Sequence, residues 1–142
     1  MDNLTKKQRS YTMSKIKRSR TKPELILIPI MKKLGLRYQP KGILGRPDFG
    51  NKKIQVAVFV NGCFWHGCPK HYKEPKTNRT YWRKKIKLNM KRDKRNTSLL
   101  KRAKWKVVTI WEHDLNNYHS ISLNRKLTLI RWYISGGTNA TP

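Results

Sequence analysis

The segment Ile54–Val60 constrains the fold most, because it is a nearly continuous run of Ile, Val, Ala and Phe bounded by polar residues. β-Branched and aromatic residues at this length predict a β-strand, and the weak alternation with polar residues predicts that both faces are buried. A strand buried on both faces needs helices on both sides of its sheet. The sequence therefore predicts an α/β fold with a central sheet flanked by helices.

A first core helix is marked by its start and stop signals. Thr21 and Glu24 have the spacing of a capping box, which predicts a helix that begins at Thr21 and stops at Gly35. Pro29 lies inside this helix and predicts either a kink or a short first helix. Segment 37–39 is a candidate short strand, and Val107–Trp111 is a second strand followed by a helix over 123–134.

A long helix is predicted over 80–103, and its inward face is unusual. At spacings of three or four it carries Trp82, Ile86, Asn89, Asp93, Asn96 and Leu100. A helix that only packed would place apolar residues at all of these positions. We therefore expect Asn89 and Asp93 to meet polar partners in or beside a functional site.

The charge of the chain points to a polyanionic partner. Its 142 residues contain 34 Lys and Arg against 7 Asp and Glu, a formal net charge of +27. Such a surface repels itself unless a polyanion neutralises it, and contacts with phosphates gain from counterion release. No apolar run approaches the roughly 20 residues that span a bilayer, and no signal peptide is recognised. We expect a protein of the cytoplasm that binds nucleic acid and no membrane.

The chain divides into three parts by composition. Residues 1–20 form a basic N-terminal arm, for which a solvated tail and a DNA-contacting arm are both open interpretations. Residues 21–135 are expected to form one domain, and residues 136–142 a flexible tail.

The segment 45–71 gathers groups with distinct chemistry. Asp48 can hold a hard cation against a phosphate, His66 can transfer a proton near neutral pH, and Phe64 with Trp65 offers flat surface to bases. Without its neighbours, Asp48 would be interpreted as a turn residue after Pro47. Together these groups suggest a nuclease centre.

Soft metal ligands lie in the same segment. Cys63, Cys68, His71 and the distant His113 form a two-Cys, two-His set that suits tetrahedral zinc. The alternatives are a Cys63–Cys68 disulfide or two free thiols. A zinc ion here would tie the loop that carries His66 to the end of the second strand.

Several short motifs occur in the order and spacing of one family. They are Arg9-Ser-x-x-Met13, Gly45-Arg-Pro-Asp-Phe49, Gly62-Cys-Phe-Trp-His66, Tyr81-Trp82, Arg92-Asp93 and Trp111-Glu112. Over roughly residues 8–115 the chain resembles the very-short-patch repair (Vsr) endonucleases. The resemblance implies a restriction-endonuclease-like fold, a magnesium-dependent nick beside the thymine of a T:G mismatch, and a structural zinc.

The resemblance also implies roles for single residues. Asp48 matches the magnesium-binding acid, His66 the catalytic histidine, and Asp93 the acid that orients it. Glu24 matches an acid that reaches the metal through water, alongside its helix-capping interpretation. The alternatives are a zinc-ligand role for His66 and an arginine ion pair for Asp93.

Three positions depart from the best-known members of the family. Asn61 stands where they carry a second histidine, and asparagine cannot act as a base at neutral pH. Three consequences are open: slower cutting, an Asn61 carbonyl oxygen that serves as a metal ligand, or proton transfer by His66 alone. Val60 replaces a threonine, a mild change if the metal contact is made by the backbone carbonyl. His113 replaces a cysteine, which zinc accepts.

The DNA-contacting residues follow from the same resemblance. Phe64, Trp65 and Trp82 match aromatics that insert beside the mismatch, and Met13 matches a residue that presses in from the arm. Core packing is the open alternative for Trp82. Asn89 is assigned to the same surface, and the Lys and Arg of 83–95 to phosphates.

The function expected is mismatch-directed nicking of duplex DNA by a monomer, with repair proteins as possible partners, at the nucleoid of a prokaryote or phage host. Two other functions stay open. One is a Vsr-like site-specific or homing endonuclease that cuts intact DNA, and the other is a zinc-stabilised DNA-binding module that has lost its chemistry.

Overall fold

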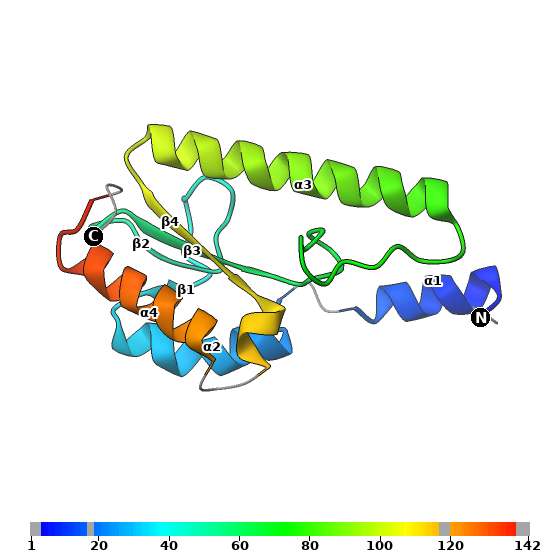
Figure 1. The fold of residues 1–142 in the computed structure, drawn as a ribbon, viewed down its shortest axis with the longest axis horizontal. Coiled ribbons are helices and arrows are strands. Elements are labelled where there is room, and N and C mark those ends of the chain that lie inside the picture. Colours follow the sequence, from blue (N-terminus) through cyan, green and yellow to red (C-terminus); the bar gives the residue numbers. More distant parts are fainter. Residues whose placement is uncertain (1–3, 17–18, 117–119, 139–142) are drawn as a thin grey trace.

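The computed structural model describes residues 4–16, 19–116 and 120–138, and shows a four-stranded sheet between helices (Figure 1). The strands are β1 (Arg37–Tyr38), β2 (Phe49–Asn51), β3 (Val56–Asn61) and β4 (Lys106–Trp111), in the order β1-β2-β3-β4. β1 and β2 run antiparallel to their neighbours, and β3 pairs with β4 in parallel. The predicted α/β fold is therefore confirmed as a mixed sheet with helices.

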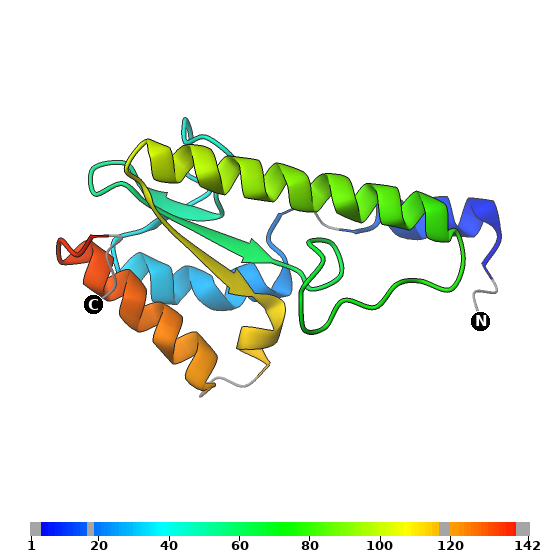
Figure 2. The same cartoon turned by 45° about the horizontal axis from the view of Figure 1, so that its top comes forward.

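The helices cover the sheet on both sides, as the apolar strand predicted. They are α1 (Lys6–Ser14), α2 (Lys22–Lys33), α3 (Arg79–Arg102) and α4 (Ile121–Ile134), with a short 3₁₀ helix η1 (Glu112–Leu115). Figure 2 shows α3 on one side of the sheet and α2 with α4 on the other. No described helix is long and apolar enough to cross a membrane.

The core is divided by the sheet into two parts. The larger part joins α2 and α4 to one face of the sheet through Leu27, Met31, Val58, Ile110, Leu127 and Ile130. The smaller part joins α3 to the other face through Ile43, Ala57 and Leu100, with Phe59 and Val107 packed against them. Because side chains alternate along a strand, Asn61 falls on the α3 side with Ala57 and Phe59.

The predicted elements match the structure closely, with three differences. Residues 49–51 form β2, which was not predicted, and residues 6–14 form α1 within the basic arm. α2 continues through Pro29 to Lys33, so the short-helix interpretation is wrong. Residues 1–3 and 17–18 of the arm, and 139–142 of the tail, lie outside the described residues.

A buried carboxylate joins β4, η1 and α4. Asp114 is 1% exposed. It accepts hydrogen bonds from the Trp111 amide at 2.8 Å, from Lys126 Nζ at 2.6 Å and from the Ser122 hydroxyl. Burial alone would raise the pKa of Asp114, but these donors outweigh it and the pKa lies below its usual value.

We predict that Lys126→Met lowers the free energy of unfolding by about 2 kcal/mol, because it leaves Asp114 buried without its cation. The exposed neighbour Arg125 provides the matched control, and Arg125→Met should change stability by less than about 0.5 kcal/mol. Urea unfolding at pH 7 measures both. Equal effects of the two substitutions would contradict this view of the Asp114 cluster.

Candidate active site and metal centre

The candidate site lies at the edge of the sheet where β3 and β4 end. Asn61 and Trp111 are register partners in the parallel pair, so the segments that follow both strands begin side by side. β2 is antiparallel to β3, with Phe49 opposite Val58. The residue before β2, Asp48, therefore also reaches this edge.

Asp48 is held against the end of β3. Its Oδ2 accepts a hydrogen bond of 2.7 Å from the Val60 amide. Burial raises the pKa of the Asp48 carboxyl to about 6; the Val60 amide and His66 lower it, and the charge of Glu24 raises it further. Glu24, Asp48 and His66 are therefore close enough to interact electrostatically.

Glu24 is 4% exposed and is bound from two sides. Its Oε2 accepts a hydrogen bond from the Arg20 amide at 2.9 Å and another from the Tyr38 hydroxyl. The predicted capping box is wrong, because Glu24 bonds the amide before the Thr21 N-cap and Thr21 makes no side-chain cap bond. Burial, and then the hydrogen bond to Glu24, raise the pKa of Tyr38.

His66 and Asp93 form a close pair. His66 Nδ1 lies 2.6 Å from Asp93 Oδ2, and their side chains are 24% and 29% exposed. A carboxylate at Nδ1 selects the tautomer in which Nε2 carries the free lone pair and can accept a proton. Asn89 holds the same loop, since its side-chain amide donates to the Trp65 carbonyl at 3.0 Å. Asn89 and Asp93 of the α3 stripe therefore have the polar partners that the sequence predicted.

Three of the predicted DNA-contacting aromatics form one half-buried cluster. The ring centroids of Phe64, Trp65 and Trp82 lie 5.1–5.8 Å apart, and these rings belong to neither part of the core. Trp82 therefore packs with these aromatic rings, outside both parts of the core. Trp82 also lines a cavity of about 820 Å³ between α1 and the start of α3, together with Met13 of α1.

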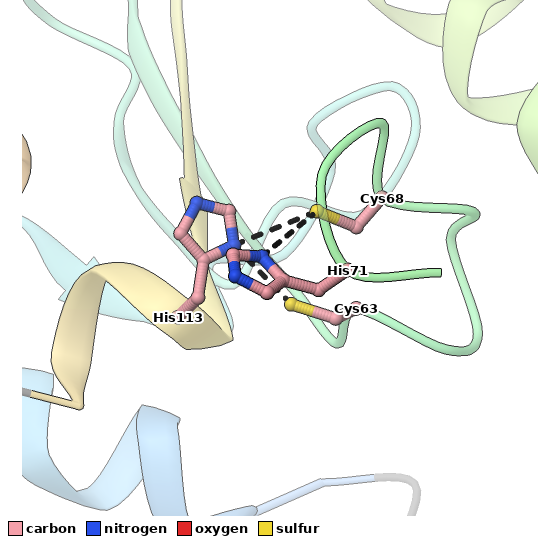
Figure 3. Close-up of side chains that lie close together, drawn as sticks. All are labelled: Cys63, Cys68, His71 and His113. Carbon is pink, nitrogen blue, oxygen red and sulfur yellow. Dashed lines mark hydrogen bonds between the residues drawn. The ribbon is translucent and has the colours of Figure 1, made fainter. Parts of the chain in front are cut away.

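The four predicted soft ligands converge (Figure 3). The ligand atoms of Cys63, Cys68, His71 and His113 all lie within 4.8 Å of one another. His113 Nδ1 is 3.3 Å from Cys63 Sγ and 3.5 Å from Cys68 Sγ, and His71 Nδ1 is 3.9 Å from Cys68 Sγ. Ligands of a tetrahedral zinc are separated by about 3.3–3.8 Å, given metal–ligand bonds of about 2.0–2.3 Å. The group can therefore hold a metal ion.

The His113 imidazole of this cluster favours the neutral form that binds metal, whereas the Cys63 thiol must lose its proton to bind one. Both cysteines are free, which excludes the disulfide alternative. Burial lowers the pKa of His113, which favours the neutral imidazole, and burial raises the pKa of the Cys63 thiol. His66 bonds Asp93 and lies outside this group of four.

Several residues that support the site were not predicted in these roles. Glu112 accepts a hydrogen bond from the Cys63 amide at 3.2 Å and so joins the His66 loop to η1. Asp114 Oδ1 lies 3.6 Å from His113 Nε2, on the side of the ring away from the sulfurs. Tyr38 binds Glu24. Glu112 and Asp114 come just after β4, and acidic residues at the end of a strand could have been predicted as part of a site. Tyr38 lies in a two-residue strand, and no pattern in the sequence indicates its contact with Glu24.

An oriented imidazole, a carboxylate of raised pKa and a strongly basic surface define the class of protein as a nuclease. Comparison with known proteins agrees. A family model described as DNA mismatch endonuclease Vsr matches residues 1–73.

Three relatives are similar over most of the chain. A type II nicking enzyme of Neisseria meningitidis serogroup C, V.NmeDIP, is 45% identical over 81% of this chain and 80% of its own length. V.NaeI, a type II nicking enzyme of Lentzea aerocolonigenes, is 41% identical over 75% and 68%. The DNA mismatch endonuclease Vsr of Escherichia coli K12 is 34% identical over 75% and 70%. The chain belongs to the Vsr family and is a DNA endonuclease, a phosphodiester hydrolase.

The raised pKa of Asp48 predicts a loss of stability with rising pH in metal-free protein. The folded carboxyl titrates at about 6 against an ordinary value of 3.8, so its stability contribution is complete below pH 3.8 and disappears by about pH 6. This interval corresponds to at most about 3 kcal/mol. Asp48→Asn cannot ionise, so its stability relative to wild type should rise by about 2 kcal/mol between pH 4 and pH 8.

Urea unfolding with a chelator at both pH values measures this difference. Asn51→Asp is unsuitable as a control because Asn51 is half-buried and its side-chain amide donates to the Gly35 carbonyl at 3.0 Å, which a carboxylate cannot do. Exposed Lys52→Gln serves instead and should show no pH-dependent difference. A constant difference for Asp48→Asn would contradict the burial of its charge.

Proposed function

We propose that this endonuclease nicks one strand of duplex DNA beside the thymine of a T:G mismatch and so starts very-short-patch repair. The observation that carries the proposal is the His66–Asp93 pair, in which Nδ1 and Oδ2 lie 2.6 Å apart. The Asp48 carboxyl, whose pKa is raised by burial, interacts electrostatically with His66. The name of the Escherichia coli relative, a DNA mismatch endonuclease, supports mismatch recognition. The mixed sheet flanked by helices supports a restriction-endonuclease-like fold.

Oxygen ligands at Asp48 fit a magnesium ion. The Val60 amide occupies Oδ2, so we assign Oδ1 of Asp48 and the Val60 carbonyl as ligands, with Glu24 acting through water. Bound Mg²⁺ would polarise the scissile phosphate and neutralise the charge that develops on it. Asn61, on the α3 side of the strand end, offers a further carbonyl oxygen but no base.

Proton transfer is assigned to His66. Asp93 holds Nδ1–H, which leaves Nε2 to take a proton from the attacking water. The negative charge of Asp93 stabilises the imidazolium that results. This arrangement needs no second histidine at position 61.

Mismatch selection is assigned to the aromatic cluster. Unstacking a base step costs a few kcal/mol and is cheapest where pairing is already poor, so a wedge of Phe64, Trp65 and Trp82 favours a mispair. Met13 lies across the same cavity and can press on the opposite groove. Asn89 keeps the Trp65 loop in place. A monomer carries all of these groups.

A second candidate function is nicking of intact DNA at a specific sequence. The names of the Neisseria and Lentzea relatives as type II nicking enzymes favour it. The chemistry assigned to Asp48 and His66 is the same in both functions, and only the recognition step differs.

The nicking of an end-labelled T:G duplex tests the proposal, with a T:A duplex of the same sequence as control. We expect Mg²⁺-dependent cutting of one strand of the T:G duplex only. Asp48→Ala should slow it by about a thousandfold, since the metal stabilises the transition state by several kcal/mol. Equal cutting of both duplexes would reject mismatch recognition in favour of site-specific nicking. If neither duplex is cut, the remaining candidate function is that of a DNA-binding module that has lost its chemistry.

We further propose that the cluster of Cys63, Cys68, His71 and His113 holds a structural zinc. Purified protein should then contain one zinc ion per chain, measured by elemental analysis. His71→Gln should lose it, whereas the matched variant His66→Gln should keep it, because His66 lies outside the cluster. Equal loss of zinc from both variants would contradict this assignment.

A further inference from the structure

The 24-residue helix α3 has two faces of different chemistry. Its inner face carries the stripe from Trp82 to Leu100 that contacts the sheet and the His66 loop. Half a turn away, exposed basic side chains recur along the helix and form what we term the outer row: Lys84, Lys87, Lys91, Lys94, Arg95 and Arg102. At about 1.5 Å per residue this row is about 27 Å long, close to the roughly 34 Å of one duplex turn.

Within the part of the chain that the structure describes, the outer row has no counter-charge. Among the described residues, the ion pairs of α3 are those of Arg79 and Arg83 with Glu74, of Arg92 with Asp93, and of Asp93 with His66. Lys87 and Lys91, and Lys91 and Arg95, are four residues apart, and like-charged pairs at this spacing destabilise a helix. A row of this kind is stabilised when an external polyanion lies along it.

The outer row is separated from the proposed cleavage site by the body of the helix. Asp93 and Trp82 point to the opposite side, and a helix with its side chains is about 10–12 Å across. In both views the side of α3 away from the sheet is uncovered over most of its length (Figures 1 and 2). Lys91 and Arg95 therefore lie across the helix from the His66 site, so we reassign these two side chains from the phosphates of the cleaved duplex, where the sequence placed them, to a different DNA segment.

We propose that the outer row is a second, sequence-independent binding surface for duplex DNA. It holds the phosphate backbone of a second segment while the cleft holds the first. Lys and Arg side chains spaced along a straight helix give backbone contacts without base recognition. The consequence is direct transfer of the protein from one DNA segment to another without full release. The surface does not take part in cutting, so this inference stands or falls separately from the proposed function.

The test uses full-length protein bound to a fluorescent duplex and chased with unlabelled duplex at rising concentration, in buffer without Mg²⁺ so that the duplex is not cut and the proposed zinc stays in place. Direct transfer makes the apparent dissociation rate rise with competitor concentration, whereas simple release leaves it constant. Wild type should show the rise. The outer-row variant Lys87→Gln, Lys91→Gln, Arg95→Gln should lose it by about fivefold or more, because three phosphate contacts are removed.

A matched variant removes the same charge elsewhere. The triple variant Lys52→Gln, Lys53→Gln, Arg125→Gln changes three exposed basic residues away from α3. Its apparent dissociation rate should rise with competitor concentration as steeply as that of wild type. Glutamine is a good helix former, so the outer-row variant should fold, which circular dichroism checks. A constant rate in wild type, equal slopes in all three proteins, or equal loss in both variants would each overturn the proposal.

Discussion

The candidate site depends on the parallel pairing of β3 with β4. Because Asn61 and Trp111 are register partners, the two segments that follow them start at one edge of the sheet. One segment contributes Cys63, Cys68 and His71, and the other contributes His113. The antiparallel β2 brings Asp48 to the same edge, where the Val60 amide binds it. The order and direction of the strands thus bring the Cys–His cluster and the proposed catalytic groups to the same edge of the sheet.

The chain has only seven acidic residues, and each of those that the structure describes has a defined partner. Of seven, Asp2 lies outside the described residues. Each of the others has a defined partner at or near the site: Glu24 with Tyr38, Asp48 with Val60, Glu74 with Arg83, Asp93 with His66, Glu112 with Cys63, and Asp114 with Lys126. Glu74 pairs with exposed Arg79 and Arg83, and Asp93 with exposed Arg92. Among the described residues, most of the basic surface has no acidic partner and is available to DNA. The site is acidic inside a basic protein, a separation suited to holding a cation next to phosphate.

Local pattern predicted most of the fold, and long-range contacts account for what it missed. The apolar run of β3 and the stripe of α3 were strong signals, and polar Asp93 on that stripe correctly indicated a polar partner. Residues 49–51 are too few for any periodicity to show, so β2 was missed. The spacing of Thr21 and Glu24 predicts a capping box at the start of α2, but Glu24 instead accepts a hydrogen bond from Tyr38 of β1, which only the fold brings near. The Asp114–Lys126 contact joins η1 to α4, and no regular sequence spacing predicts a contact between two separate elements.

The central claim is that the metal-closed loop holds His66 against Asp93. The most direct test is proton NMR of the His66 Nδ1–H, which a hydrogen bond as short as 2.6 Å should shift far downfield. We predict that the resonance is present in zinc-loaded protein, absent in Asp93→Asn, and lost from wild type when zinc is removed by a chelator. A resonance that persists unchanged after metal removal would contradict the claim.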